Sequence, residues 1–285
     1  MKSKAIFGLS VITALVIALY FSFHNIIGID PPIEDTISHV QDLPMNLSIY
    51  LDLSDRIKPD GSSALSQKEK DIAIVENLAN VIKERAVKQK ILPCKDRIKV
   101  FFYPAPSDAK IVMLADNLEL DLSTTQMNEK KKVLISFVNE FKSSLEKVYT
   151  ATIETSNWQG SDIWGFFNKP IDTYCIKNGY RNVLVVLTDG YIYYEPTATM
   201  QEGHAFSKIT NTTLKDPASS LIANREGLEN LEVLMLELNP NPMSLQPKME
   251  QVITDWLKKM GVQKCYVGET DVPSNTKMII ENFLN

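Results

Sequence analysis

Hydrophobic and polar positions are arranged along this chain in blocks that predict strands and helices in turn. Nearly continuous apolar runs, which are typical of strands buried on both faces of a parallel sheet, lie at residues 47–53, 183–187 and 231–238. Between these runs, apolar residues recur every three or four positions, as on one face of a helix, at residues 72–82, 134–148 and 249–260. The alternation predicts an α/β fold with a doubly wound, mainly parallel central sheet flanked by helices.

Shorter segments complete the predicted order of elements. Residues 97–105 and 110–116 are predicted to form two neighbouring strands. Residues 161–176 are predicted to form a helix that is interrupted or bent at its proline, because proline disrupts a helix interior. The last two predicted elements are a short strand at residues 264–269 and a closing helix at residues 275–284.

The N-terminus carries a different pattern. Lys2 and Lys4 precede an uncharged apolar run at residues 5–23, which is long enough to cross a bilayer as a helix. Acidic residues follow the run, and this distribution of charge places residues 1–4 in the cytoplasm. We predict an uncleaved transmembrane anchor here. A cleaved signal peptide is the alternative, although the residues after the run offer only poor small-x-small cleavage sites.

The segment after the apolar run is predicted to be a tether. Residues 24–45 contain Pro31, Pro32 and Pro44 among acidic residues, a composition that disfavours regular structure. The main domain is then predicted at residues 46–285. With the N-terminus in the cytoplasm, the chain is expected to be a single-pass membrane protein whose main domain lies in the periplasm or at the cell surface.

Composition and charge narrow the classes of function. The formal net charge is −5 and no stripe of lysine and arginine stands out, so nucleic acid is not expected as a partner. The three cysteines are far apart, without a C-x-x-C pair, and the three histidines are scattered as well. The sequence therefore predicts neither a zinc site nor a disulfide framework.

Acidic residues stand at the ends of two predicted core strands. The first apolar run ends on Asp52 and the clearest strand of the chain ends on Asp189. Ser161 and Asp162 stand at a predicted helix start after a glycine. Open parallel sheets bind ligands beyond the carboxyl ends of their strands, and carboxylate and hydroxyl oxygens are the ligands that Mg²⁺ requires. These side chains are therefore candidates for one shared site.

The order of these motifs resembles the von Willebrand factor A domain. In that family a strand-end Asp-x-Ser-x-Ser, a loop threonine and a later strand-end aspartate form a metal-ion-dependent adhesion site. The resemblance covers nearly all of residues 46–285. It implies that Mg²⁺ is held by Asp52, Ser54, Ser161 and Asp189, with Ser161 in place of the threonine. It also implies that an acidic residue of a protein partner supplies the last ligand.

Arg56 departs from the family pattern, because it stands where the second serine is expected. A guanidinium has no acceptor and stays charged, so it cannot bind a metal. If Arg56 points inward, it could lie between Asp52 and Asp189 and neutralise them in place of the metal. If it points outward, the remaining ligands could still hold Mg²⁺, with a hydroxyl from Ser62 or Ser63. The sequence leaves both arrangements open; Arg56 and Asp162 are the residues expected to modify the site.

Two classes of function fit these motifs. The favoured one is a membrane-tethered binding or scaffolding module of the cell envelope that carries out no chemistry and meets a protein partner, with or without a divalent metal. The alternative is a Mg²⁺-dependent phosphohydrolase of Rossmann-like fold, in which a strand-end aspartate attacks phosphorus. A dehalogenase-type phosphohydrolase has a second aspartate two residues after the nucleophile, where this chain has Ser54. We therefore favour a protein that is not an enzyme.

Overall fold

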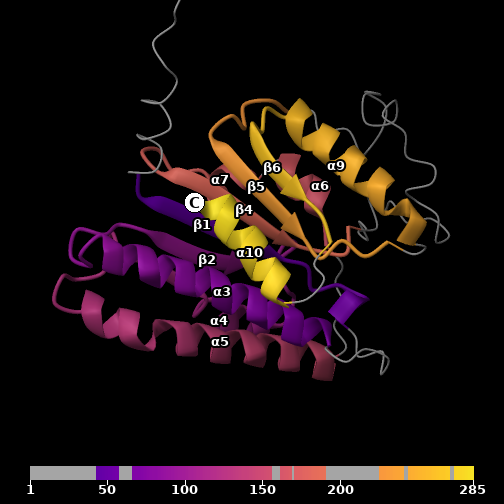
Figure 1. The fold of residues 1–285 in the computed structure, drawn as a ribbon. Helices are drawn as coiled ribbons and strands as arrows, with labels where there is room; N and C mark the ends of the chain where they lie inside the picture. Colours follow the sequence, from indigo (N-terminus) through magenta and orange to yellow (C-terminus); the bar gives the residue numbers. More distant parts are fainter. Residues whose placement is uncertain are drawn as a thin grey trace, which may run out of the picture. The chain divides into compact units, whose positions relative to one another are not determined.

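A six-stranded sheet runs through the centre of the fold in a computed structural model of the chain (Figure 1). The structure describes residues 43–57, 66–155, 161–168, 170–190, 225–240, 243–269 and 273–285. The strands are β1 Met45–Leu51, β2 Arg97–Phe101, β3 Glu119–Asp121, β4 Arg181–Leu187, β5 Leu231–Leu236 and β6 Lys264–Val267.

The strand order in the sheet is β3-β2-β1-β4-β5-β6. All neighbouring strands are parallel except β2 and β3, which pair antiparallel at one edge. After β1, the chain adds β2 and β3 on one side of it. It then returns to place β4 on the other side of β1 and adds β5 and β6 beyond it, so the topology reverses between β1 and β4. The α/β fold with a mainly parallel sheet, predicted from the sequence, is confirmed by this arrangement.

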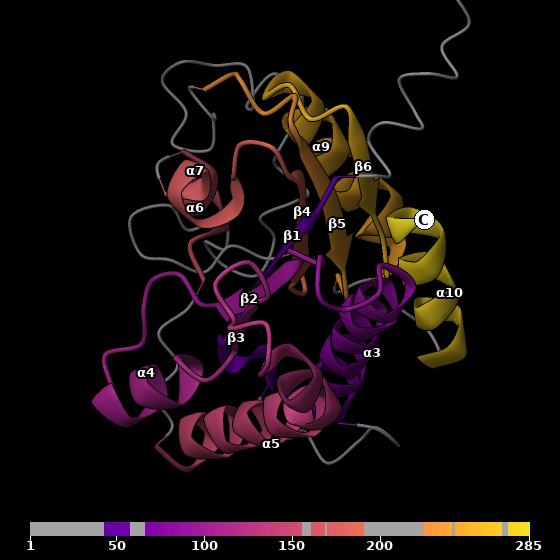
Figure 2. The ribbon, with the colours of Figure 1, turned by 90° about the vertical axis from the view of Figure 1, so that its left-hand side faces the viewer.

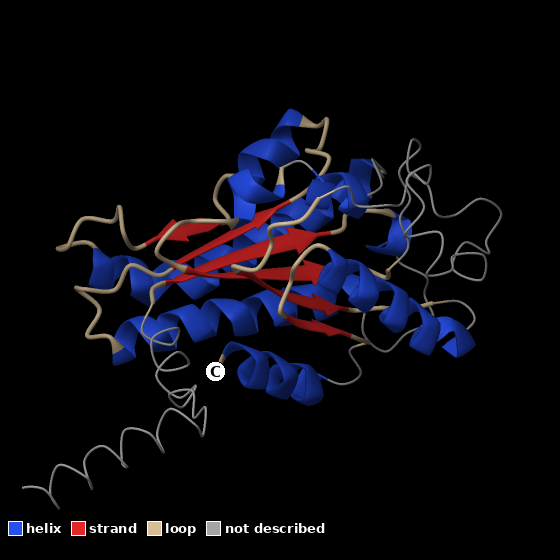
Figure 3. Ribbon diagram, turned by 90° about the horizontal axis from the view of Figure 1, so that it is seen from above, coloured by secondary structure: helices blue, strands red, loops and turns tan. Residues whose placement is uncertain are grey.

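Helices cover both faces of the sheet, as Figures 2 and 3 show. One hydrophobic core lies beneath α3 Gln67–Lys88, α4 Ala109–Ala115, α5 Lys130–Thr155 and α10 Pro273–Leu284. The second core lies beneath α6 Ile163–Asn168, α7 Ile171–Cys175 and α9 Gln246–Lys259. Two short 3₁₀ turns complete the described elements, η1 Asp55–Ile57 and η2 Met243–Leu245.

The central strands are buried along their whole length because both faces are covered. Every residue of β1 and of β4 is buried. Side chains alternate between the two cores along β1: Ile49 and Leu51 belong to the core under α3 and α5, and Tyr50 to the core under α6. This explains the mainly apolar runs in the sequence, in which the few polar residues, such as Ser48, are buried and hydrogen-bonded.

Most predicted elements are confirmed, and one is wrong. The long predicted helices correspond to α3, α5 and α9, and a break at Pro170 separates α6 from α7. Residues 110–116, predicted as a strand, form most of helix α4 and its C-terminal cap, Asp116. The Asp108 side chain caps the N-terminus of this helix. Residues 111–114 are all apolar, although only Ile111 is buried, so the sequence shows no helical period there. The antiparallel strand β3 that follows was not predicted.

The N-terminal predictions fall largely outside the described residues, which begin at Leu43. The predicted anchor at residues 5–23 therefore cannot be compared with the structure. Within the part of the chain that the structure describes, no helix is both long enough and apolar enough to cross a membrane. Met45, the last residue of the predicted tether, is the first residue of β1.

We predict that Gly190→Ala destabilises the protein by about 1–3 kcal/mol, because overpacking in a core typically costs that much. Gly190 follows β4 with a φ of 88°, and a Cβ atom there would lie 2.5 Å from the Sδ atom of Met249. Met249 is fully buried, so its thioether can move only by displacing other core atoms.

Gly179→Ala is the matched control for this prediction. Gly179 has a φ of 78° but nothing within 4 Å of the added Cβ atom, so this variant reports backbone strain alone. Both free energies of unfolding are measured by denaturant titration. Equal losses in the two variants would contradict the close approach of Gly190 to α9.

Candidate functional site

The parallel pairing of β1 with β4 brings the predicted strand-end residues together. Leu51 of β1 is in register with Leu187 of β4, and the Asp52 N–H donates to the Leu187 carbonyl at 3.1 Å. Asp52 and Thr188 therefore stand side by side just beyond the strands, and Asp189 follows Thr188. This is the point where the sheet topology reverses, which is where open α/β sheets bind ligands.

Asp52 is fully buried, and both of its carboxylate oxygens accept hydrogen bonds. Oδ1 accepts from the Ser54 N–H at 2.8 Å, and Oδ2 accepts from the Thr188 hydroxyl at 2.9 Å. Burial raises the pKa of Asp52, while the Arg56 charge and these hydrogen bonds act in the opposite direction. Thr188 was not among the predicted site residues, and in the structure its hydroxyl holds the Asp52 carboxylate.

Arg56 points inward, and only 3% of its side chain is exposed. Nη2 donates to Asp71 Oδ2 at 2.7 Å and to the Leu187 carbonyl at 3.2 Å, and Nε donates to the Asp52 carbonyl at 3.1 Å. Nε lies 4.0 Å from Asp52 Oδ2. Burial lowers the pKa of Arg56, but the carboxylates of Asp71 and Asp52 raise it by more, with a smaller contribution from Asp189.

This geometry answers the question that the sequence left open. The inward arrangement is the observed one, and the guanidinium does approach the strand ends. Its hydrogen bonds, however, go to the Asp71 carboxylate and to two main-chain carbonyls, while Nε lies 4.0 Å from the Asp52 carboxylate. Nη1 is buried, and no acceptor for it is found among the described residues.

Asp71 is the main counterion of Arg56, and it is fully buried on the first turns of α3. Besides Arg56, it accepts a hydrogen bond from the Tyr149 hydroxyl on α5 and one from the Gln67 side-chain amide at 3.0 Å. Burial and the charge of Asp71 raise the pKa of Tyr149, which therefore stays protonated as a donor. Three donors thus compensate the desolvation of one carboxylate.

Asp71 and Tyr149 were missed by the sequence analysis, although a signal was present. Asp71 precedes Val75 and Leu78 by four and seven positions, so a charged residue stands on the apolar face of a predicted helix. Such a charge needs a buried partner. The sequence shows that a partner must exist but does not identify it as Arg56.

Glu237 adds another carboxylate to the same region. It follows β5 with a φ of 75°, is buried, and accepts a hydrogen bond from the Gln67 side-chain amide. Because Gln67 also donates to Asp71, one amide links the two carboxylates. Burial and the charge of Asp71 raise the pKa of Glu237.

Ser161 and Asp162 lie on the α6 side of the sheet. The Ser161 hydroxyl is 2.7 Å from the Tyr50 hydroxyl, and Tyr50 donates its only proton to the Tyr103 carbonyl at 2.7 Å. Ser161 must therefore be the donor to Tyr50. Asp162 Oδ1 accepts from the Gly165 N–H at 2.8 Å, which caps the first turn of α6. Asp162 thus has a structural role at the start of α6.

The residues that the resemblance assigns to Mg²⁺ do not fit such an ion in this arrangement. The guanidinium of Arg56 lies beside the Asp52 carboxylate, with Nε 4.0 Å from Oδ2. A Mg²⁺ ion about 2.1 Å from Oδ2 would stand close to that positive charge. Within the described ranges, no cluster of three or more His, Cys, Asp or Glu side chains could hold a metal. Ser62 and Ser63 lie outside the described residues.

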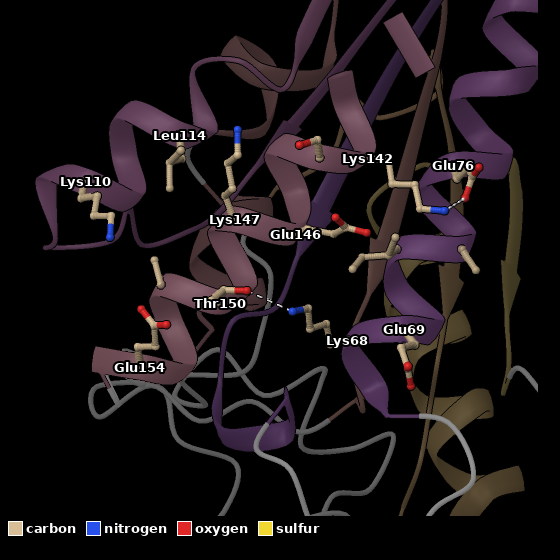
Figure 4. A pocket seen from close by; sticks show the side chains of 14 residues that line it. Lys68, Glu69, Glu76, Lys110, Leu114, Lys142, Glu146, Lys147, Thr150 and Glu154 are labelled. Carbon is tan, nitrogen blue, oxygen red and sulfur yellow. Dashed lines mark hydrogen bonds and ion pairs between the residues drawn. The ribbon is translucent and has the colours of Figure 1, made fainter. Parts of the chain in front are cut away.

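A separate groove of about 760 Å³ lies between α3, α4 and α5 (Figure 4). Lysine and glutamate side chains line it in similar numbers, and Lys142 pairs with Glu76 at 2.8 Å. Lys68 donates to the Thr150 hydroxyl at 3.0 Å across the groove. None of the strand-end residues lines this groove, so the two features are distinct.

Comparisons with known proteins add no identification: neither the models of protein families nor the curated protein sequences contain a match to this chain. The resemblance to the von Willebrand factor A domain therefore stays a prediction from the motifs.

We predict that Tyr149→Phe lowers the free energy of unfolding by about 1.5–3 kcal/mol, the range for a hydrogen bond to a charged group. The ring stays in place, so the loss reports the hydroxyl that donates to Asp71. Tyr174→Phe, at a partly exposed tyrosine, is the control. If denaturant titration gives the same small change for both variants, the Tyr149 hydroxyl does not stabilise Asp71.

Glu237→Gln is predicted to stabilise the protein at pH 7. The raised pKa means that folded Glu237 holds its proton more tightly than an ordinary glutamate of pKa 4.5. Its contribution to stability is therefore fully present below pH 4.5 and is lost as the pH rises through the folded pKa. Glutamine keeps the shape and removes this loss.

The measurement for this prediction is the free energy of unfolding from pH 4 to pH 8 in the parent and in Glu237→Gln. The exposed Glu140→Gln variant is the control. The stability difference between Glu237→Gln and the parent should grow with pH. A difference that is constant across this range would show that Glu237 has an ordinary pKa.

Proposed function

We propose that this chain is a protein-binding or scaffolding module of the von Willebrand factor A type, and that it carries out no chemistry. In this proposal residues 5–23 tether it to a membrane of the cell envelope, with the domain outside the cytoplasm. The partner meets the carboxyl edge of the sheet near Asp52 and Asp189. The observation that carries the proposal is that Asp52 and Thr188 meet at the reversal of the strand order, with Asp189 next along the chain.

The burial of Asp52 disfavours the alternative, a Mg²⁺-dependent phosphohydrolase. A nucleophilic aspartate must reach a phosphorus atom with a free oxygen. Asp52 is fully buried, and the positive charge of Arg56 lies beside its carboxylate. A binding surface has no such requirement, because the neighbouring side chains can make the contact.

The proposal predicts that a partner is lost when the strand-end edge is altered. Full-length protein in mild detergent is used to capture partners from the envelope fraction, beside an Asp189→Asn variant. The control is Glu140→Gln, an exposed change on α5. A protein captured by the parent and the control but not by Asp189→Asn supports the edge as the binding surface.

Circular dichroism of each variant shows that the loss is not caused by unfolding. Capture of the same proteins by parent, control and a folded Asp189→Asn variant would contradict the proposed surface. Turnover of a phosphate ester by the parent that Asp52→Asn abolishes would instead favour the enzyme.

A further inference from the structure

We propose that Arg56 is a permanent, built-in cation that takes the place of the divalent metal implied by the motif, and that Asp71 and Tyr149 hold it there. The strand-end edge is then complete without Mg²⁺. The inference concerns the cation at the same surface and relies on the proposed function only in treating that surface as a binding site.

The first observation that supports the inference is the position of the Arg56 guanidinium. Its hydrogen bonds reach the last carbonyl of β4, at Leu187, and the carbonyl that follows β1, at Asp52. The Leu187 carbonyl also accepts from the Asp52 N–H, so Arg56 is its second donor. The Asp52 carbonyl lies beyond the strand, where the sheet no longer supplies a donor. A single side chain thus joins the two central strands at the point where their topology reverses.

The second observation that supports the inference is the counterion of Arg56, Asp71. Asp71 lies on α3, outside the motif, and receives hydrogen bonds from Arg56, Tyr149 and Gln67. Both charged side chains are nearly or fully excluded from solvent. A fully desolvated carboxylate with fixed donors holds the guanidinium in one orientation. An arginine that merely pointed away from a metal site would not need such a partner.

The consequence is that a metal has no place to bind unless Arg56 leaves. A divalent ion at the Asp52 carboxylate would stand beside the positive charge of Arg56, whose Nε lies 4.0 Å from Oδ2. Without a metal, there is also no open coordination position for an acidic side chain of the partner. Binding at this edge should therefore not depend on divalent ions.

The test compares thermal melts of full-length protein in detergent, each with MgCl₂ and with EDTA. The parent should melt at the same temperature in both. Arg56→Ser removes the cation and restores the hydroxyl of the motif, so it should melt lower than the parent in EDTA. MgCl₂ should then raise its melting temperature by about 2–4 °C or more.

Arg85→Ser is the matched control. Arg85 also pairs with a fully buried aspartate, Asp96, at 2.9 Å, and it lies at the other end of α3. This variant should lose stability without any response to MgCl₂. A response in both variants would indicate a general effect of magnesium on the destabilised protein and would overturn the inference.

A double variant tests the same inference if Arg56→Ser does not fold. Arg56→Ser with Asp71→Asn removes both charges of the pair, so it should melt higher than either single variant. A double variant that melts no higher than the singles shows that the pair is not coupled and overturns the inference. A parent that EDTA destabilises, or a folded Arg56→Ser that ignores MgCl₂, overturns it as well. None of these melts requires a partner, so their failure is distinguishable from failure of the proposed binding function.

Discussion

The ion pair between Arg56 and Asp71 is the interaction on which the strand-end site depends. It lies out of solvent and joins the loop after β1 to α3, and through Tyr149 it reaches α5. Breaking such a pair from one side typically costs about 3–5 kcal/mol, because the remaining charge stays buried. The same guanidinium bonds to the main chain at the ends of β1 and β4. Arg56 therefore contributes both to the stability of the fold and to the charge of the strand-end site.

The sheet topology explains why this pair lies where it does. The two central strands are covered on both faces, so every polar side chain within them or at their ends needs a hydrogen-bond partner. There, Asp52 and Thr188 come into register, and Glu237 follows the next strand. Burial makes each carboxylate costly, which is why each one is matched by fixed donors from α3, α5 or the loops. In this way a motif that resembles a metal site contains a buried arginine, Arg56, beside Asp52.

The sequence predicted the strands and long helices well, because their apolar periods are long and regular. It failed for residues 110–116, where a short helix buries one residue and leaves no period. It also predicted that Asp52 and Asp189 stand at the ends of neighbouring strands. It could not predict that Asp71 and Tyr149 hold Arg56, because these contacts join distant elements. Whether Arg56 pointed inward could be decided only once its partner on α3 was known.

The most direct measurement is a crystal structure of the protein soaked with Mn²⁺, with anomalous diffraction recorded to locate the ion. Our account predicts that the Arg56 guanidinium lies against Asp71 and the carbonyls of Asp52 and Leu187, with no anomalous peak at the Asp52 carboxylate. An anomalous peak coordinated by Asp52 and Asp189, with Arg56 turned away from Asp71, would contradict the built-in cation.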